Sequence, residues 1–350
     1  MKTVTVRASR TYEVKIGTGL LSGLGAEVTA LGGIRKAAVT SDSTVFPLYG
    51  QRVMQSLSDA GLETADFVFP AGEASKNGAT LLEALNSLAE NRLTRSDLVV
   101  ALGGGVVGDL AGFAAAVYLR GIRFVQIPTT LLAAVDSSVG GKTAVDLPAG
   151  KNLAGAFWQP SLVLCDLDTL TTLPEDIFRD GCAEVIKYGV LYDPALFAHL
   201  AARTLHFDRE AVIARCVELK RDVVAQDEFD TGVRMKLNLG HTVGHGVEAR
   251  SGFTVSHGKA VAIGMAVIAR AAEKKGFCTA DTRRQIEEVL RAFGLPTRTE
   301  EPAAALADAA LSDKKRTGGT VRLIVPRTVG ECGIEPVPVA QLEDWIQAGL

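Results

Sequence analysis

In the first half of the chain, short apolar runs alternate with stretches whose apolar residues recur at helical spacing. Residues 1–17 alternate polar and apolar positions, which is typical of a pair of strands. Helical spacing is clearest at residues 80–90, through Leu81, Leu82, Leu85 and Leu88. The apolar runs that we interpret as strands are residues 36–40, 66–69, 97–102, 123–127 and 162–165. Strand and helix in alternation predict an α/β domain with a parallel sheet, which binds ligands at the carboxyl ends of its strands.

The pattern changes near Leu173. From residue 175 to about residue 311 nearly every segment has helical periodicity, and residues 321–325 form one late strand before a final helix from Gln341. We therefore expect two domains: an α/β domain over residues 1–173 and a mainly helical domain over residues 174–350.

Composition and charge exclude several classes of protein. The 350 residues are 47% apolar and 22% charged with a net charge of −3, which argues against a general nucleic-acid-binding surface. No run approaches the roughly 20 apolar residues of a membrane span, and the first residues lack the apolar core of a secretory signal. The five cysteines are scattered without a CxxC pair, which fits a reducing cytoplasm better than a disulfide framework.

A glycine-rich turn follows the apolar strand at residues 97–102. Gly103, Gly105 and Gly108 satisfy GxGxxG, with Gly104 between them, and a helix is expected to start near Val106. Glycines at such a turn let the backbone approach a pyrophosphate, as in dinucleotide-binding domains.

The turn differs from an ordinary Rossmann arrangement. Asp109 in the first helical turn suits either the helix dipole or a bond to a ribose or a nicotinamide amide. No acid ends the next strand, so a ribose partner must come from an earlier strand, where Asp42 or Glu73 is suitable.

A second glycine-rich segment, DSSVGGKTAVDLPAGKNL, carries lysines. The P-loop pattern GxxxxGK[ST] does not fit, because Asp136 stands five residues before Gly141. Lys142 and Lys151 beside Asn152 suit an anionic substrate or the pyrophosphate of the cofactor.

Three of the five histidines fall within seventeen residues. The segment RMKLNLGHTVGHGVEARSG is interpreted as one helix, with Arg234, Asn238, His241 and His245 on one face. Glycines inside a helix cost about 1 kcal/mol each, so we expect them to permit close approach of a substrate or another backbone. His199 and His206 lie outside this cluster and are interpreted as structural.

Two further residues complete a possible metal site. His257 precedes an apolar helix at residues 260–272, and Glu184 lies on another helix with Lys187 and Tyr188 one turn later. Three protein ligands of the His/His/Glu type are typical of catalytic zinc. Spacing alone leaves open whether His245 or His257 is the third ligand and whether Glu184 is the acid. HExxH is absent, which disfavours peptidase chemistry.

Together these motifs resemble the 3-dehydroquinate synthase family. GGGVVGD, YLRGIRFVQIPTTLLAAVDSSVGGKT, GKNLAGAF, GCAEVIKYG, LNLGHTVGH, SHG and DKK occur in the order and spacing of that family, from about Asp42 to Arg316. Small departures occur away from the ligands: Ala144, Asp146 and Leu147 stand where Gly, Asn and His are frequent, and Asp176-Ile177 where Arg-Glu is frequent.

The resemblance implies a Rossmann-like NAD-binding domain, a helical metal-binding domain and a cytoplasmic homodimer of the shikimate pathway. The activity it implies is a lyase that converts 3-deoxy-D-arabino-heptulosonate 7-phosphate to 3-dehydroquinate and phosphate, using NAD and one zinc or cobalt ion. It also implies no nucleic-acid or membrane partner.

Site residues follow from the resemblance position by position. The metal ligands would be Glu184, His241 and His257, with His245 as a proton-transfer group. The cofactor contacts would be Asp42, Glu73, Lys76, Gly104, Gly105, Asp109, Thr129, Thr130, Asp136, Lys142, Lys151 and Thr172. The substrate contacts would be Arg120 from across the dimer, Asp136, Lys142, Asn152, Lys187, Lys220, Arg234, Asn238, His245 and one of Lys314 or Lys315.

Three alternatives are weighed against this hypothesis. A metal-dependent polyol dehydrogenase of the glycerol type would bind a neutral substrate and would not need the cations around Lys142. A sister sugar-phosphate cyclase is disfavoured, by resemblance, by Lys142, Asn152, Arg234 and Asn238. A non-catalytic NAD or metal sensor would be expected to lack several of these residues, and all of them are present.

Overall fold

The structure is a computed structural model that describes residues 1–252, 254–312 and 319–350. The chain divides into two compact units: Met1–Pro174 with Arg209–Phe229 forms unit 1, and Glu175–Asp208 with Asp230–Leu350 forms unit 2. Residues 209–229 thus group with unit 1, whereas the sequence pattern places all of residues 174–350 in one domain. Their helix packs against the first strand of unit 1, and helical periodicity alone does not show which body a helix packs on.

The described residues of unit 1 form a seven-stranded sheet in the order β1-β2-β9-β6-β5-β3-β4. All neighbouring strands are parallel except the β1–β2 pair at one edge, which is antiparallel. The strands are β1 (Lys2–Arg7), β2 (Thr11–Gly17), β3 (Lys36–Asp42), β4 (Glu63–Phe69), β5 (Leu98–Gly103), β6 (Arg123–Pro128) and β9 (Leu162–Asp166). Each strand expected from the apolar runs is present.

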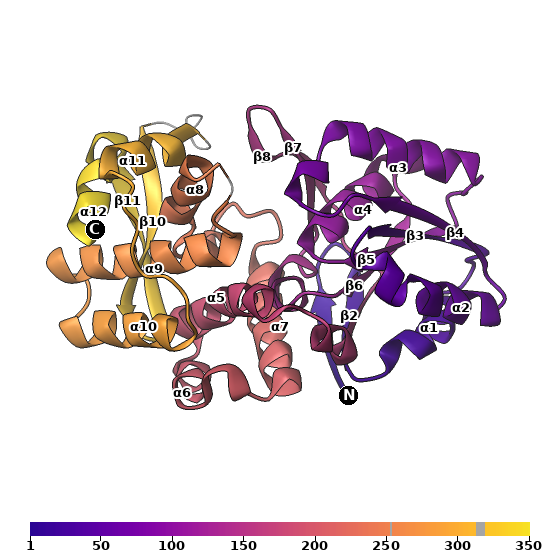
Figure 1. Ribbon diagram of the computed structural model, residues 1–350, viewed down its shortest axis with the longest axis horizontal. Helices are drawn as coiled ribbons and strands as arrows, with labels where there is room; N and C mark the ends of the chain where they lie inside the picture. The colour runs from indigo at the N-terminus through magenta and orange to yellow at the C-terminus, as the bar shows by residue number, and fades with distance from the viewer. Residues whose placement is uncertain (253, 313–318) are drawn as a thin grey trace. The chain divides into compact units, whose positions relative to one another are not determined.

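Helices cover both faces of this sheet (Figure 1). Val100 and Leu102 of β5 pack in one core with α1 and α2, whereas Val99 and Ala101 pack in another with α3 and α4. Successive residues of a strand point to opposite faces, so a strand covered on both sides reads as continuously apolar. The helices of unit 1 are α1 (Leu24–Ala30), α2 (Gln51–Asp59), α3 (Gly78–Glu90), α4 (Gly105–Val117) and α7 (Arg209–Gln226).

A hairpin of β7 (Lys142–Leu147) and β8 (Gly150–Phe157) was not expected from the sequence. It contains the lysine-bearing glycine segment. Much of β8 is exposed or half-buried and carries two glycines, so it lacks the apolar alternation that indicates a strand.

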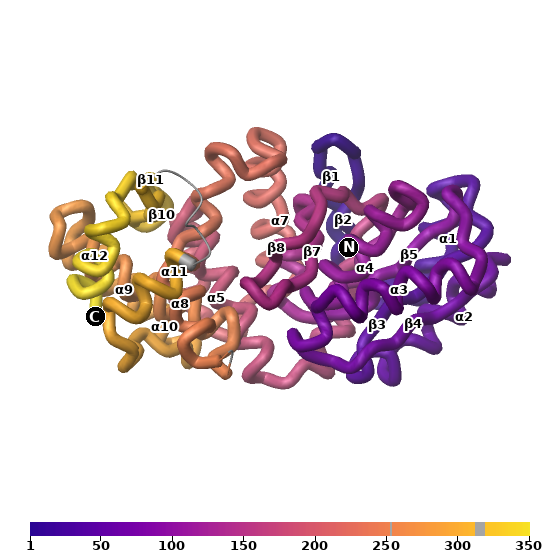
Figure 2. Tube along the Cα trace, turned by 90° about the horizontal axis from the view of Figure 1, so that it is seen from above, coloured from indigo at the N-terminus to yellow at the C-terminus, as the bar shows by residue number. Residues whose placement is uncertain are grey.

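Unit 2 is mainly helical, with α9 lying between α10 and α12 (Figures 1 and 2). Its helices are α5 (Glu175–Tyr192), α6 (Pro194–Arg203), α8 (His241–Arg250), α9 (His257–Lys274), α10 (Ala280–Ala292), α11 (Ala303–Ser312) and α12 (Leu342–Gly349). The late strand expected at residues 321–325 is part of a hairpin of β10 (Thr320–Thr328) and β11 (Glu331–Pro338). No helix among the described residues is long and apolar enough to cross a membrane. The fold is therefore an N-terminal Rossmann-like sheet domain combined with a mainly helical domain.

The interpretation of the histidine segment as one helix is wrong. A 3₁₀ helix covers Val233–Asn238, and α8 begins only at His241, because Gly240 between them has a φ of 79°. A Cβ atom on Gly240 would lie 2.6 Å from the carbonyl oxygen of Val261, and one on Gly264 would lie 1.9 Å from that of Gly240. The glycines thus let α8 and α9 pack with their backbones in contact, which confirms the expectation of close approach. Arg234 and Asn238 do not share a face of α8 with His241.

Candidate functional site

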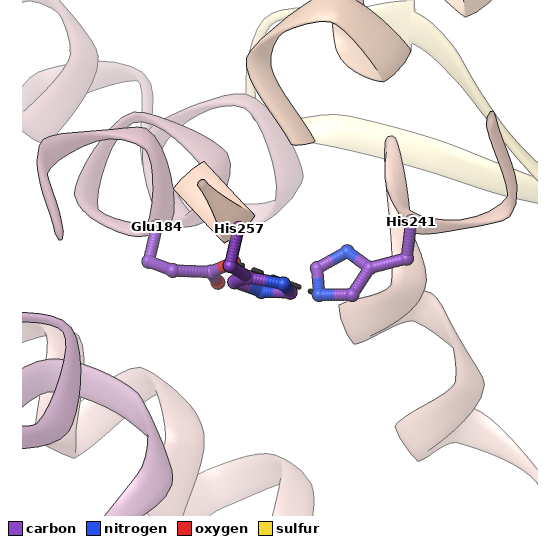
Figure 3. A group of neighbouring side chains, drawn as sticks. All are labelled: Glu184, His241 and His257. Carbon is purple, nitrogen blue, oxygen red and sulfur yellow. Dashed lines mark ion pairs between the residues drawn. The ribbon is translucent and has the colours of Figure 1, made fainter. Parts of the chain in front are cut away.

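Three elements of unit 2 bring one acid and two histidines together (Figure 3). Glu184 lies on α5, His241 is the first residue of α8 and His257 is the first residue of α9. One ligand atom from each lies within 4.8 Å of the others. Sequence spacing left open whether His245 or His257 joins Glu184 and His241. In the structure, the histidine at ligand distance from both is His257.

The distances within this group fit a tetrahedral ion. Oε1 of Glu184 lies 3.5 Å from Nε2 of His241 and 3.4 Å from Nε2 of His257. Two ligands bound at about 2.0–2.1 Å to a tetrahedral zinc ion would lie about 3.3 Å apart. The residues present thus match a divalent ion in both donor chemistry and spacing.

The outer nitrogen of each imidazole also has a partner. Nδ1 of His241 lies 3.0 Å from the carbonyl oxygen of Leu239, which can only accept, so the nitrogen donates. Nδ1 of His257 lies 3.4 Å from Oε2 of Glu248. Both rings therefore present Nε2 toward Glu184. Sequence reasoning missed Glu248, although an acid seven residues after His241 on the same helix was a usable signal.

The surroundings of the two histidines shift their pKa values in opposite directions. Burial, and then the nearby Lys187, lower the pKa of His241 to about 3. Burial would also lower the pKa of His257, but bonds to Glu184 and Glu248 outweigh it and raise that pKa to about 10. The metal-free group thus favours a positive charge beside its carboxylates, which is the charge that a metal ion would supply.

Two residues of the predicted substrate set, His245 and Lys187, lie close to this group. The ring centroid of His245 is 5.6 Å from that of His241 and 6.4 Å from that of His257. Lys187 forms an ion pair with Glu184, and both Lys187 and Arg234 are 1% exposed. Asn238 ends the 3₁₀ helix two residues before Gly240. Lys314 and Lys315 lie outside the described residues.

In unit 1 the glycine-rich turn has the geometry of an anion-binding helix start. Gly104 is the N-cap of α4, and a Cβ atom on it would lie 3.1 Å from Cγ2 of Thr130. The neighbouring Thr129 is 3% exposed, and its Oγ1 has no hydrogen-bond partner within the described part of the chain. A buried hydroxyl without a partner fits a position that a bound polar ligand completes.

Lysines and acids form a network near the same helix start. Nζ of Lys76 lies 2.7 Å from Oδ2 of Asp109 and 3.7 Å from Oε1 of Glu73, and Nζ of Lys151 is also 3.7 Å from Glu73. Burial alone would lower the pKa of Lys76, but Asp109 and Glu73 outweigh it and raise the pKa, so the lysine is charged. Asp146 joins the network, since its backbone N–H donates to the carbonyl oxygen of Lys76 and its Oδ1 accepts from the backbone N–H of Asn152.

The other predicted contacts of unit 1 lie at strand ends, in loops and short helical turns, and on α7. Oδ1 of Asp42, at the end of β3, accepts from the backbone N–H groups of Thr44 and Val45. Nζ of Lys220 on α7 donates to both the carbonyl oxygen and Oδ1 of Asp136, at 2.8 Å each. The remaining members are Arg120, which has a φ of 68°, Thr130, whose Oγ1 accepts from Ala133, Lys142 at the start of β7, and Thr172, whose Oγ1 lies 2.5 Å from the Tyr49 hydroxyl.

Two family models match adjacent segments of the chain. The family model described as 3-dehydroquinate synthase N-terminal matches residues 66–180, and the one described as 3-dehydroquinate synthase C-terminal matches residues 181–316. A curated relative named 3-dehydroquinate synthase, from Pelobacter propionicus, is 47% identical over 98% of both chains.

Two solved structures share the fold over nearly the whole chain. One is 2-deoxy-scyllo-inosose synthase complexed with carbaglucose-6-phosphate, NAD+ and Co2+, with a TM-score of 0.89 at 23% identity and 100% coverage of both chains. The other is 2-epi-5-epi-valiolone synthase from Streptomyces hygroscopicus subsp. jinggangensis with NAD+ and Zn2+ bound, with a TM-score of 0.88 at 27% identity and 98% coverage of both.

Proposed function

Because the chain belongs to the 3-dehydroquinate synthase family, we propose that it converts 3-deoxy-D-arabino-heptulosonate 7-phosphate to 3-dehydroquinate and phosphate. The observation that carries the proposal is the group of Glu184, His241 and His257, held at ligand spacing in a chain whose relatives carry this name. The reaction is a lyase reaction without net redox change, because the hydride taken from the substrate is returned to it.

Two bound groups would supply the chemistry that side chains lack. NAD would accept and return the hydride, and a zinc or cobalt ion would polarise a substrate hydroxyl. Glu184, His241 and His257 would hold the ion. The pyrophosphate of NAD would fit at the start of α4, against Gly104, Gly105 and the backbone amides there. Thr129 would offer the cofactor a buried hydroxyl.

His245 would move protons at the substrate. It stands one turn after His241 on α8 and lies outside the ligand-spaced group, next to the ring of His241. A neutral imidazole has one donor and one acceptor nitrogen, so the same ring can take up a proton and release it during the reaction.

Basic side chains of this chain would bind the carboxylate and the phosphate of the substrate. Lys187 and Arg234 are almost fully buried in unit 2, and ammonium and guanidinium groups are the side chains that bind carboxylates and phosphates most strongly. The further substrate contacts that we propose are Arg120, Asp136, Lys142, Asn152, Lys220, Asn238 and one of Lys314 or Lys315. This set disfavours a polyol dehydrogenase, whose neutral substrate needs no such cations.

We further propose that the enzyme is a cytoplasmic homodimer in which Arg120 reaches across to the partner subunit. Leu119, Arg120 and Gly121 all have positive φ, so the chain turns sharply at Arg120 between α4 and β6. A monomer in sedimentation would contradict both statements.

The direct test follows phosphate release and nicotinamide absorbance together, with the heptulosonate phosphate and NAD. We expect chelator-sensitive phosphate release without accumulation of NADH. Accumulation of NADH with a simple polyol, and no phosphate release, would instead indicate a dehydrogenase.

A further inference from the structure

A second buried acid stands behind the proposed metal ligands. Glu248 on α8 is 3% exposed, and its Oε2 lies 3.4 Å from Nδ1 of His257. On the other side of the same ring, Nε2 lies 3.4 Å from Glu184. The imidazole is therefore bracketed by two carboxylates, and a carboxylate this deeply buried needs polar partners.

The backbone of His257 is already fixed by α5. Oδ1 of Asp180, one turn before Glu184, accepts from the Ser256 hydroxyl at 2.5 Å and from the backbone N–H of Lys259 at 2.9 Å. A Cβ atom on Gly258 would lie 1.9 Å from the carbonyl oxygen of Asp180. The start of α9 is thus held against α5, and the remaining freedom of His257 is the rotation of its side chain.

The two histidine rings are oriented by different kinds of group. Nδ1 of His241 donates to the carbonyl oxygen of Leu239, two residues away on its own chain segment. The partner that faces Nδ1 of His257 is a side chain, Glu248, from the neighbouring helix. A carboxylate behind a ligating imidazole fixes its tautomer, orients the ring and raises its basicity.

We infer that Glu248 is a positioning residue, which holds His257 with Nε2 directed at the metal and so sets the affinity of the site. The inference rests on the proposed function only in so far as the group binds a metal ion. It predicts an effect on metal affinity that is independent of the substrate.

The test measures cobalt binding to metal-free protein, by competition with a chromogenic chelator and by the visible spectrum of the bound ion. Glu248→Ala removes the acceptor, and we expect cobalt to bind 10- to 100-fold more weakly, with an altered spectrum. Glu248→Gln keeps an acceptor oxygen but loses the charge, so we expect a smaller, several-fold loss. If the alanine variant does not fold, the glutamine variant decides, because it conserves the volume of the side chain.

Glu287→Gln is the matched control, since Glu287 is another buried acid of unit 2 on a different helix. It should bind cobalt as the wild type does. Wild-type affinity and spectrum in the Glu248 variants would overturn the inference, as would an equal loss in the control. Cobalt binding by the wild type without phosphate release would overturn the proposed function but leave the role of Glu248 standing.

Discussion

Glu184 and Glu287 are both buried acids of unit 2, yet their surroundings differ in kind. Glu287 on α10 is 3% exposed, and its oxygens lie 2.5 Å from Nε of Arg270, 2.6 Å from Nη2 of Arg291 and 3.4 Å from Nη1 of Arg283. Glu184 is fully buried beside Lys187, and two imidazoles face it at 3.4–3.5 Å.

The difference separates a structural charge from a binding site. Guanidinium groups already supply Glu287 with positive charge, and Arg270 also donates to the carbonyl oxygens of Thr297 and Gly349, so the cluster links α9 to α10 and the C-terminal segment. Both rings beside Glu184 direct Nε2 inward, and this nitrogen binds a metal cation once it carries no proton. A buried acid among arginines stabilises the fold, whereas a buried acid among imidazoles at ligand spacing indicates a metal.

The largest expected effect is that of Glu184→Gln. Loss of a charged ligand should remove the metal and lower phosphate release on the order of 10³-fold, since a metal supplies several kcal/mol of transition-state stabilisation. Metal content and phosphate release are measured on the same preparation, with circular dichroism to check folding. The matched Glu287→Gln variant should retain both, and equal inactivation of the two would erase the distinction between them.

His245→Asn tests whether His245 is a proton-transfer group or a metal ligand. Its loss should lower the rate of phosphate release roughly 10²-fold, as expected for a proton-transfer group. Metal content should stay at the wild-type value, because His245 lies outside the ligand-spaced group. Loss of metal in this variant would show that His245 is a ligand.

Glu287→Gln should reduce the free energy of unfolding by roughly 3 kcal/mol at neutral pH, as for a broken buried ion pair. Burial would raise the pKa of Glu287, but Arg270 and then Arg291 outweigh it and lower the pKa below its ordinary value. The stabilisation is therefore present above the unfolded pKa and is lost as the pH falls through the folded one. Urea unfolding of both proteins should show the difference shrinking toward acidic pH, and a difference that grows would contradict the ion-pair account.

The smallest expected effect extends the comparison to unit 1. Thr129→Val removes a buried hydroxyl that has no partner within the described residues, so NAD should bind roughly 5- to 10-fold more weakly with little cost in stability. In Thr143→Val the lost hydroxyl donates to the carbonyl oxygen of Ala156, so about 1 kcal/mol of stability should be lost and NAD affinity kept. Calorimetry and thermal unfolding measure both, and unchanged NAD affinity in Thr129→Val would remove Thr129 from the cofactor site.

Much of the fold could be predicted because its signals are local. The apolar run at residues 97–102 becomes β5, and the glycines after it become the N-terminus of α4. Features that depend on tertiary packing could not be predicted from the sequence. The helix through Arg234 and His245 is broken at Gly240, because the backbone of α9 passes there, and the β7–β8 hairpin has no apolar periodicity.

In the candidate site, too, the local motifs could be predicted, but the way they come together in space could not. Residue spacing left the third histidine open and the family resemblance implied Glu184, His241 and His257. The structure brings these three together, because α5, α8 and α9 meet through contacts between residues far apart in the sequence. The position of Glu248, seven residues after His241, was a usable signal in the sequence, but its pairing with His257 depends on how the eight residues between them connect α8 to α9.

The most direct measurement is a titration of metal-free enzyme with zinc or cobalt, in the presence of NAD and the heptulosonate phosphate, while phosphate release is followed. Activity should rise in proportion to added metal and level off at about one ion per chain, the stoichiometry of a site with three protein ligands. Full phosphate release without metal, or a titration that Glu184→Gln reproduces unchanged, would contradict the assignment of Glu184, His241 and His257 as the catalytic metal site.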